Sequence, residues 1–383
     1  MTLCLYLISP CLGNDQHLHL LRPQLEKSPR KTKGSPPQPH KSLSNMSTDV
    51  ELDKSWPLLA EKGRERIARY QPHDRHFDEQ VQSSLNAFID WLPEGGRESI
   101  ARDCIKATTD DDLYQVFENL FTGLAIPMQA RSKPPSVKDS PHPYRRDNVE
   151  TIAGILDKSN SREHDFHSRC LQRDSYKCVI TGEIDFDYWK RKLGKPDGIA
   201  FSPTEGAHII PFSYASWENS KTSSHDRAKA WEVLYRCFPQ VRRAGLIVNN
   251  IHDLSNGLTL RRSIHDEFGK FHIALKPTEI PNKYEVKYFD SFPLSDRRLL
   301  PESIELKQAK DAQRLDLPDR VLLDCHYRLA EILNASGLGY IIEQHIRRWK
   351  NLKVNTYNAV IREDGGSDIG EFLHAGLWQH VMG

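Results

Sequence analysis

Three short segments in the middle of the chain each place one polar residue in an apolar, regular context. His208 lies in the run 206–211, whose apolar residues predict a strand that a proline closes. Asn256 opens the run 256–260, where Asn-Gly followed by apolar residues indicates a hairpin turn and a second strand. His265 follows nine positions after Asn256, on a predicted helix. We therefore expect two strands and a helix to bring these three side chains together.

Such a set of side chains suits the hydrolysis of a phosphodiester. That reaction needs an activated water, a cation for the developing charge and a proton source for the leaving oxygen. Histidine changes its charge near neutral pH, so we expect His208 to act as the general base. Asn256 is expected to fix the turn or orient His208, and His265 to present a neutral imidazole to a divalent metal. Arg261 and Arg262 precede His265 and are expected to bind phosphate oxygens of nucleic acid.

Each of these residues also has a simpler explanation. A lone histidine in an apolar strand is usually structural. Asn-Gly is a common hairpin signal without catalytic content, and two adjacent arginines often form a solvated face. The order of the three segments, preceded by a predicted strand and turn at 176–182, is what favours chemistry over these alternatives.

The combined stretch resembles the HNH (ββα-metal) nuclease domains found in many fungal proteins. The resemblance covers roughly 165–277 and rests on residues 173–182, 206–212, 256–260 and 264–271. It implies a metal-dependent endonuclease in which the residue matching His208 is the general base. It also implies that the residue matching Asn256 shapes or orients the site, and that the one matching His265 binds the metal, with Asn256 as a further candidate ligand.

The sequence departs from that family's fuller pattern at two ligand positions. The residue before the general base is often Asp or His, and here it is Ala207; a second ligand often stands four residues after the final histidine, and here it is Gly269. Off-pattern carboxylates are therefore candidate ligands, namely Glu205, Asp266 and Glu267. Mg²⁺ takes few protein ligands and keeps its waters, so it is the first expectation, with Mn²⁺, Ni²⁺ or Zn²⁺ as alternatives.

The fold expected from these patterns is α+β, with a central ββα-metal motif embedded between helical N- and C-terminal segments. Asn256 stands 48 positions after His208, which implies an inserted helix between the two strands. Alternating runs on either side of Pro281 and Asn282 predict a further hairpin. The expected segments are a disordered basic Ser/Pro-rich leader (1–48), a helical segment (49–130), a Pro-rich linker (131–146), an HNH nuclease-like domain (147–295) and a C-terminal helical segment (296–383).

Composition limits the partners and the compartment. Charged residues make up 27% of the chain but the net charge is +1, so contact with nucleic acid, DNA being the first expectation, must come from a local patch. The seven cysteines form no C-x-x-C pair, which favours reduced thiols inside the cell. Neither a signal peptide nor a membrane span is predicted. We therefore expect an intracellular protein, in the nucleus or the cytoplasm, with no membrane partner.

Two other classes stay open at this stage. A catalytically degenerate HNH scaffold would serve as a protein-interaction or nucleic-acid-binding module, as the two vacant ligand positions suggest. A structural zinc site built from Cys178, His208 and His265 is disfavoured, because the ligands are dispersed and compact C-x₂₋₄-C spacing is absent.

Overall fold

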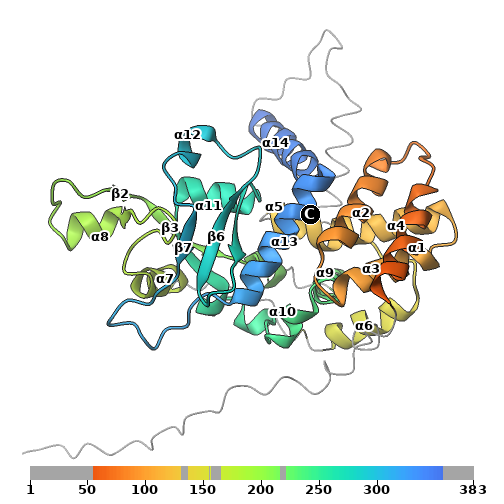
Figure 1. The fold of residues 1–383 in the computed structure, drawn as a ribbon, viewed down its shortest axis with the longest axis horizontal. Helices are drawn as coiled ribbons and strands as arrows, with labels where there is room; N and C mark the ends of the chain where they lie inside the picture. Colours follow the sequence, from red (N-terminus) through yellow and green to blue (C-terminus); the bar gives the residue numbers. More distant parts are fainter. Residues whose placement is uncertain (1–54, 131–136, 155, 157–164, 216–220, 357–383) are drawn as a thin grey trace, which may run out of the picture. The chain divides into compact units, whose positions relative to one another are not determined.

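The computed structural model describes residues 55–130, 137–154, 156, 165–215 and 221–356, which adopt an α+β architecture (Figure 1). All of them belong to one unit, His40–Gly383; a second unit, Met1–Pro39, lies outside the described residues, as does the whole of the expected leader. Within the described residues, no helix is long and apolar enough to cross a membrane.

The first described segment is helical, as its periodicity predicts. Its elements are α1 (Trp56–Ala68), η2 (Asp78–Gln80), α2 (Val81–Trp91), α3 (Gly96–Lys106), α4 (Asp110–Leu120), the π-helical turn η3 (Phe121–Ala125) and α5 (Ile126–Ala130). Gly96 opens α3, and close packing explains why this position is glycine. A Cβ on Gly96 would lie 1.9 Å from the carbonyl oxygen of Cys237, so only glycine allows this close approach.

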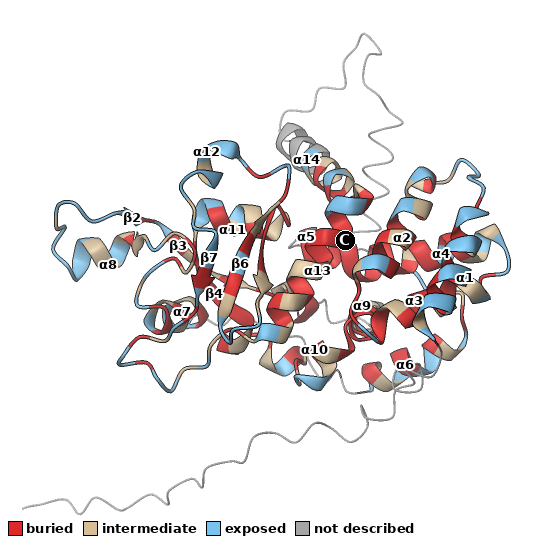
Figure 2. Ribbon diagram, in the orientation of Figure 1, coloured by how far each residue is buried: buried red, intermediate tan, exposed pale blue. Residues whose placement is uncertain are grey.

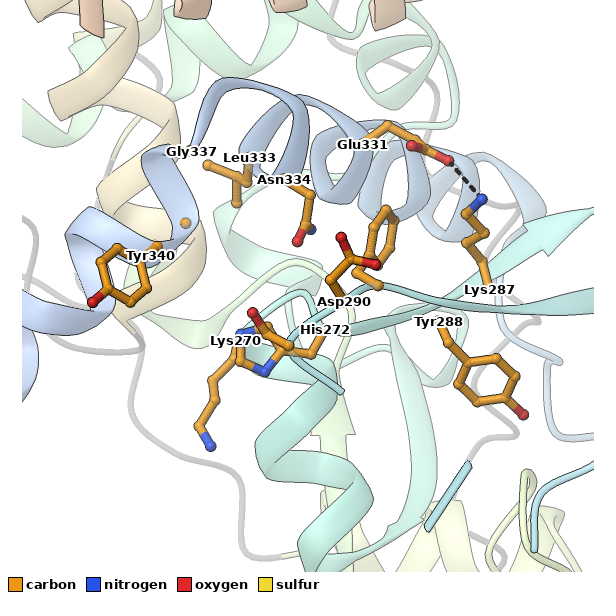
Figure 3. Close-up of a pocket in the computed structure, with 13 residues that line it drawn as sticks. Lys270, His272, Lys287, Tyr288, Asp290, Glu331, Leu333, Asn334, Gly337 and Tyr340 are labelled. Atoms are coloured by element: carbon orange, nitrogen blue, oxygen red, sulfur yellow. Dashed lines mark ion pairs between the residues drawn. The ribbon is translucent and has the colours of Figure 1, made fainter. Parts of the chain in front are cut away.

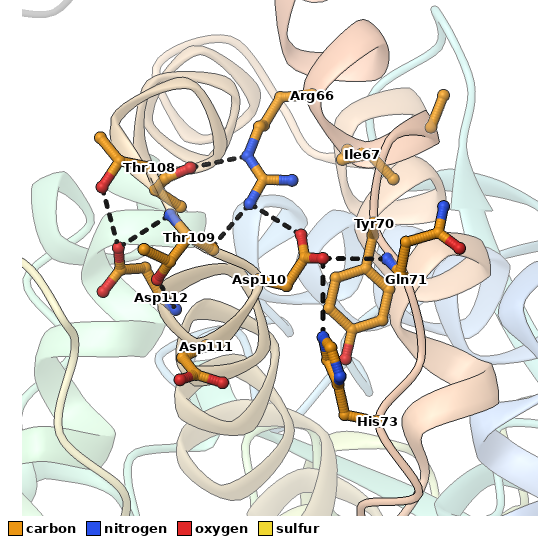
Figure 4. A network of polar contacts seen from close by, with 12 residues as sticks. Arg66, Ile67, Tyr70, Gln71, His73, Thr108, Thr109, Asp110, Asp111 and Asp112 are labelled. Carbon is orange, nitrogen blue, oxygen red and sulfur yellow. Dashed lines mark hydrogen bonds and ion pairs between the residues drawn. The ribbon is translucent and has the colours of Figure 1, made fainter.

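Polar contacts join the end of α1 to the start of α4 (Figure 4). Thr109 caps α4 by accepting the amide of Asp112 at 3.1 Å, and the Asp112 carboxylate accepts the Thr109 amide in return. Arg66 of α1 donates to the carbonyl oxygens of Ala107 at 2.7 Å and Thr109 at 2.6 Å, and to Asp110 at 3.1 Å. These bonds satisfy carbonyl groups at the turn and fix the two helices against each other.

The central segment contains an antiparallel pair of strands followed directly by a helix. Its elements are α6 (Tyr144–Ala153), α7 (Phe166–Arg173), β1 (Ile184–Asp185), α8 (Phe186–Arg191), β2 (Phe201–Ser202), β3 (Thr204–His208), η4 (Phe212–Ala215), α9 (Lys221–Cys237), α10 (Pro239–Arg243), η5 (Val248–Asn250), η6 (Leu254–Asn256), β4 (Gly257–Arg261) and α11 (Arg262–Gly269). In the β3–β4 pair, Thr204 lies opposite Arg261 and His208 opposite Gly257. The expected inserted helix is confirmed by α9.

Of the strand and turn predicted at 176–182, the turn is present but the strand is wrong. Only an isolated bridge between Lys177 and Ile184 forms there, and the backbone turns back so that Cys178 N donates to Glu183 O at 2.9 Å. The physical reason is the backbone where the run begins: Ser175 and Tyr176 both have φ near +58°, a left-handed conformation that a regular strand does not adopt. The turn is nevertheless tied to β4, because Val179 N donates to Thr259 O.

The C-terminal segment adds a three-stranded antiparallel sheet and two helices. Its elements are β5 (Ile273–Pro277), β6 (Lys283–Tyr288), α12 (Leu294–Arg297), β7 (Ser303–Glu305), α13 (Arg320–Ser336) and α14 (Leu338–Thr356), with strand order β5-β6-β7. The hairpin predicted around Pro281 and Asn282 is confirmed. Helix α13 packs against both β5 and α2, and its buried face is visible in Figure 2. The hydrophobic core therefore runs without a break from the first helices to the sheet.

A buried ionic network adds a second connection between the helical segment and the centre. Asp103 of α3 accepts from Arg236 of α9 at 2.6 Å and from Arg145 of α6 at 3.0 Å. All three side chains are 1% exposed. Residues 137–154 of the structure thus include buried positions, among them Val137, within the stretch expected to be a linker. The five-segment division stays a prediction.

Candidate active site

His208 is the last residue of β3, where the sequence predicts it, and its ring is held by two aromatic neighbours. It stacks on Phe166 of α7 with centroids 3.9 Å apart and planes 7° from parallel. Its Nε2 lies 3.1 Å from Nδ1 of His252, so one ring donates the hydrogen bond and the other accepts it. His252 is buried and stacks on Phe212 at 5.0 Å. The orientation of His208 is therefore fixed on two sides.

Sequence reasoning did not single out His252. It lies in the turn between η5 and η6, four positions before Asn256, and no local pattern distinguishes it from any other polar residue in a loop. The contact with His208 arises from the pairing of β3 with β4, which brings residues more than forty positions apart together.

Asn256 is completely buried and its side chain bonds to backbone on both sides. Its Oδ1 accepts the amide of Ile210 at 2.8 Å, while Nδ2 donates to the carbonyl oxygens of Ile210 at 3.0 Å and Ile251 at 2.9 Å. These bonds clamp the segment after His208 to the turns that precede β4. They support the shaping role expected of Asn256; they do not support a metal-ligand role, because Oδ1 is buried and already accepts an amide.

The expectation that Asn256 and Gly257 form a hairpin turn is wrong. Asn256 ends the 3₁₀ turn η6 and Gly257 has an extended backbone, with β4 pairing to a strand much earlier in the chain. Gly257 is needed for another reason: a Cβ there would lie 2.6 Å from the Phe166 ring and 2.9 Å from Sγ of Cys170. Glycine lets α7 pack directly on β4, and α7 carries the ring on which His208 stacks.

Arg173 and Asp174 brace the same region from the end of α7. The buried Arg173 guanidinium donates to both oxygens of Asp174, and to the carbonyl oxygens of Leu254 at 2.7 Å and Gly257 at 2.9 Å. Asp174 in turn accepts the Thr259 amide at 3.0 Å. Their role is to hold η6 and β4 in place.

His265 lies on the first turns of α11, as predicted, and contacts a carboxylate of β3. Its Nδ1 is 2.7 Å from Oε2 of Glu205, and Arg262 donates to Oε1 of the same carboxylate at 2.7 Å. Burial raises the pKa of Glu205, but the hydrogen bonds from His265 and Arg262 outweigh it, so the pKa is lowered. Glu205 is therefore ionised at neutral pH and paired with His265.

The alternation along β3 separates two faces of the candidate site. Successive side chains of a strand point to opposite faces. His208 shares its face with Gly206, which packs against α7, whereas Glu205 shares its face with Ala207, toward α11. Glu205 therefore lies on the same face as the vacant ligand position at Ala207.

The family comparison fits this geometry. Residues 178–276 match the family model of HNH endonucleases. This HNH domain runs from the turn at Cys178 through β3, β4 and α11 into β5, and so encloses His208, Asn256 and His265. It supports nuclease function with nucleic acid as the partner, and HNH endonucleases generally use divalent metal ions. No curated protein and no solved structure matches the chain.

The other candidate ligands of the HNH domain are not gathered around His265. Glu267 is held by Lys270 at 2.8 Å and by Nδ1 of His272 at 2.7 Å, and Gly269 ends α11. Cys178 is buried in the hydrophobic core. Within the described residues, no group of three or more His, Cys, Asp or Glu side chains is arranged to hold a metal ion. Of the three candidate carboxylates, Glu205 is the one whose hydrogen bond to His265 is seen, at 2.7 Å.

The two arginines expected to bind phosphate have different surroundings. Arg261 ends β4 and forms ion pairs with Glu183 at 3.1 Å and Asp296 at 3.5 Å, with its side chain 20% exposed. Arg262 opens α11, and its side chain is 69% exposed beside Glu205. Arg262 is therefore the better placed of the two to meet a phosphate from solvent.

A cavity of about 300 Å³ lies beyond the other end of α11 (Figure 3). It is lined by Lys270, His272, Lys287, Tyr288, Phe289, Asp290, Ser291, Glu331, Leu333, Asn334, Gly337, Gly339 and Tyr340. None of the predicted site residues is among them. Its lysines face carboxylates, since Lys287 lies 3.9 Å from Glu331, and the cavity is separate from the candidate site.

Proposed function

We propose that this protein is a metal-dependent endonuclease that hydrolyses phosphodiester bonds in nucleic acid, DNA being the first substrate to test. His208 acts as the general base and His265 as the principal metal ligand. The observation that carries the proposal is the contact between Glu205 and His265, on the face of β3 that also holds Ala207, with His208 at the end of the same strand.

The two faces of β3 correspond to the two roles. In the HNH pattern the residue before the base is often a ligand, and neighbours on a strand point to opposite faces. Adjacent positions of that pattern therefore point to opposite faces of the strand. Here Ala207 supplies no ligand, and the carboxylate two residues earlier, Glu205, meets His265 on that face.

The residues present fit a divalent cation held through His265. Metal-binding histidines usually donate their second ring nitrogen to a carboxylate, which fixes the tautomer and the ring orientation. Glu205 accepts from Nδ1 of His265 in this way, so His265 would hold the cation through Nε2. The ion, when bound, supplies charge neutralisation at the scissile phosphate.

His208 takes the proton of the attacking water, and His252 orients its ring. When His208 donates from Nε2 to Nδ1 of His252, Nδ1 of His208 is the basic nitrogen. The stack on Phe166 holds the ring in that position. That tautomer is the one in which His208 can act as a positioned general base.

Plasmid nicking tests the metal dependence. Purified protein is expected to nick supercoiled DNA in Mg²⁺ or Mn²⁺, with Ni²⁺ as a third ion, and not in EDTA. His265→Ala should abolish both nicking and one-to-one metal binding in calorimetry, whereas Ser263→Ala, an exposed neighbour on α11, should change neither by more than about twofold. Full nicking in EDTA, or full metal binding by His265→Ala, contradicts the proposal.

A matched pair of substitutions tests the orienting role of His252. His252→Phe keeps a ring that stacks on Phe212 but loses the nitrogen that faces His208, and we expect kcat to fall about 10- to 100-fold with KM unchanged. His252→Asn keeps a hydrogen-bonding group near the position of Nδ1 and should restore most of kcat. Equal losses in both variants, in proteins of unchanged thermal stability, would leave no orienting role for the hydrogen bond.

A second function, a catalytically degenerate scaffold that binds nucleic acid or protein, is favoured by one specific observation. Both Arg262 and His265 already pair with Glu205, and the described residues contain no three-ligand group. This alternative predicts no calorimetric binding of Mg²⁺, Mn²⁺, Ni²⁺ or Zn²⁺ at the site. A one-to-one complex that is lost in His265→Ala would count against it.

A further inference from the structure

A small arm of the HNH domain projects from the start of β3. It comprises residues 184–202, in which β1 and β2 pair in parallel and α8 lies between them. The arm lies at the edge of the ribbon, and Figure 2 shows its surface as mostly exposed (Figures 1 and 2). None of the residues of α8 is buried. The arm thus contributes little to the core, so packing does not account for the side chains on its surface.

The tip of the arm carries a dense positive charge. Lys190, Arg191, Lys192 and Lys195 fall within residues 190–195, where no acidic residue occurs, and all four are exposed. Arg191 forms an ion pair with Asp187 at 3.4 Å, in which both side chains are more than 60% exposed, so water weakens it. In a chain whose net charge is +1, this run is a local basic patch of the kind that attracts phosphate groups.

Aromatic and apolar side chains are exposed beside these cations. Trp189 stacks on Phe201 with centroids 3.8 Å apart, and Phe201 is 41% exposed. Leu193 and Ile199 are similarly exposed, at 40% and 39%. Surfaces that bind nucleic-acid strands combine cations along the backbone with aromatic rings on which bases stack. The arm has both components within one short segment.

The arm is rigidly coupled to the strand that ends in His208. Buried Asp185 caps α8 by accepting the Tyr188 amide at 3.0 Å, and it also accepts the hydroxyl of Thr204 at 2.7 Å. Only Pro203 separates β2 from β3. From Thr204 to His208 the strand advances about 13 Å, which matches about four nucleotides of one DNA strand at ~3.4 Å each.

We propose that residues 184–202 form a nucleic-acid-binding arm that holds the phosphate backbone a few nucleotides from the bond that is cleaved. That the arm lies near a cleaved bond rests on the proposed function, whereas its binding of nucleic acid does not. An anionic membrane surface also attracts a basic, partly apolar segment. The coupling of the arm to β3 within an HNH domain favours nucleic acid as the occupant.

The test is binding of a labelled 30-base-pair DNA duplex by the full chain in EDTA, over a series of salt concentrations. The arm variant is Lys190→Gln/Arg191→Gln/Lys192→Gln/Lys195→Gln. Its control, Lys62→Gln/Arg64→Gln/Arg69→Gln/Lys138→Gln, removes the same charge from exposed positions outside the HNH domain. We expect the arm variant to lose at least about tenfold in affinity and up to ~3.6 of the slope of log K against log salt, while the control keeps both.

Equal affinity and equal salt slope in the arm variant overturn the proposal, and so does arm-dependent binding of phosphatidylserine vesicles without binding of DNA. The proposed function fails separately. If the wild-type protein binds DNA through the arm but never cleaves it in any metal, the binding role of the arm is supported and the proposed nuclease activity is contradicted. If the wild-type protein cleaves DNA and the arm variant binds and cleaves it equally well, the nuclease activity is supported and the binding role of the arm is contradicted.

Discussion

His208→Ala is expected to slow phosphodiester cleavage by about 10²- to 10⁴-fold, the range that a positioned general base contributes. The ring ends β3, is only partly buried, and stacks on Phe166 beside the buried His252. The strand itself is held by its pairing with β4 and by the bonds of Asn256 to Ile210, which alanine at 208 leaves intact. The measurement is the initial rate of plasmid nicking, with thermal unfolding as the check on folding.

Two comparisons separate a catalytic role of His208 from a structural one. His225→Ala removes an exposed histidine of α9 that bonds to Glu150, and it should leave the nicking rate unchanged. Added imidazole should restore part of the rate of His208→Ala, because it replaces the missing base, whereas it cannot repair a packing defect. If folded His208→Ala protein nicks DNA at the wild-type rate, His208 is not the general base.

The positions of His208 and His265 were predictable because each lies in an element with a strong local pattern. The apolar run before Pro211 begins in β3 (Thr204–His208), and the periodic residues after Arg262 form α11. The hairpin turn expected at Asn256 was wrong. The Asn-Gly signal reflects local hairpin geometry, while Gly257 is set by the close packing of Phe166 from another helix.

The partners of the two histidines were less accessible to sequence reasoning. Glu205 was one of three candidate carboxylates, and only the register of β3 against α11 distinguishes it from Glu267, which bonds to His272 instead. His252 carries no local signal at all. Side chains that meet through long-range strand pairing leave no periodicity in the chain, so the pairing itself must be known first.

The helical flanks were predicted as elements, but their relation to the HNH domain was not. Helix α13 covers β5 on one side and α2 on the other, and the buried Asp103 network joins α3 to α6 and α9. The sequence pattern does not distinguish charged residues that form buried ion pairs from charged residues on the surface, because the partners lie far apart in the chain. Their burial means that the flanks support the position of α9, the helix inserted between the two strands of the site.

Asp103→Ala is therefore expected to destabilise the protein by about 3–5 kcal/mol, since it leaves Arg145 and Arg236 buried without their shared carboxylate. Asp90→Ala is the matched control: Asp90 also pairs with an arginine, Arg64, but both side chains are nearly half exposed, and the cost should stay below about 1 kcal/mol. Urea unfolding monitored by circular dichroism measures both. Similar costs in the two variants would contradict a stabilising role for the network.

The pH dependence of that cost follows from the pKa of Asp103. Burial raises the pKa, but the guanidinium groups of Arg145 and Arg236 outweigh it and lower the pKa to about 2. A carboxylate whose folded pKa lies below its unfolded value contributes stability above the unfolded value, near ~4, and loses it as the pH falls toward the folded one. The difference in unfolding free energy between wild type and Asp103→Ala should therefore be constant from pH 7 to about 5 and shrink between about pH 4 and 2. A difference that stays constant through that acid range would mean that the charge of Asp103 does not hold α3, α6 and α9 together.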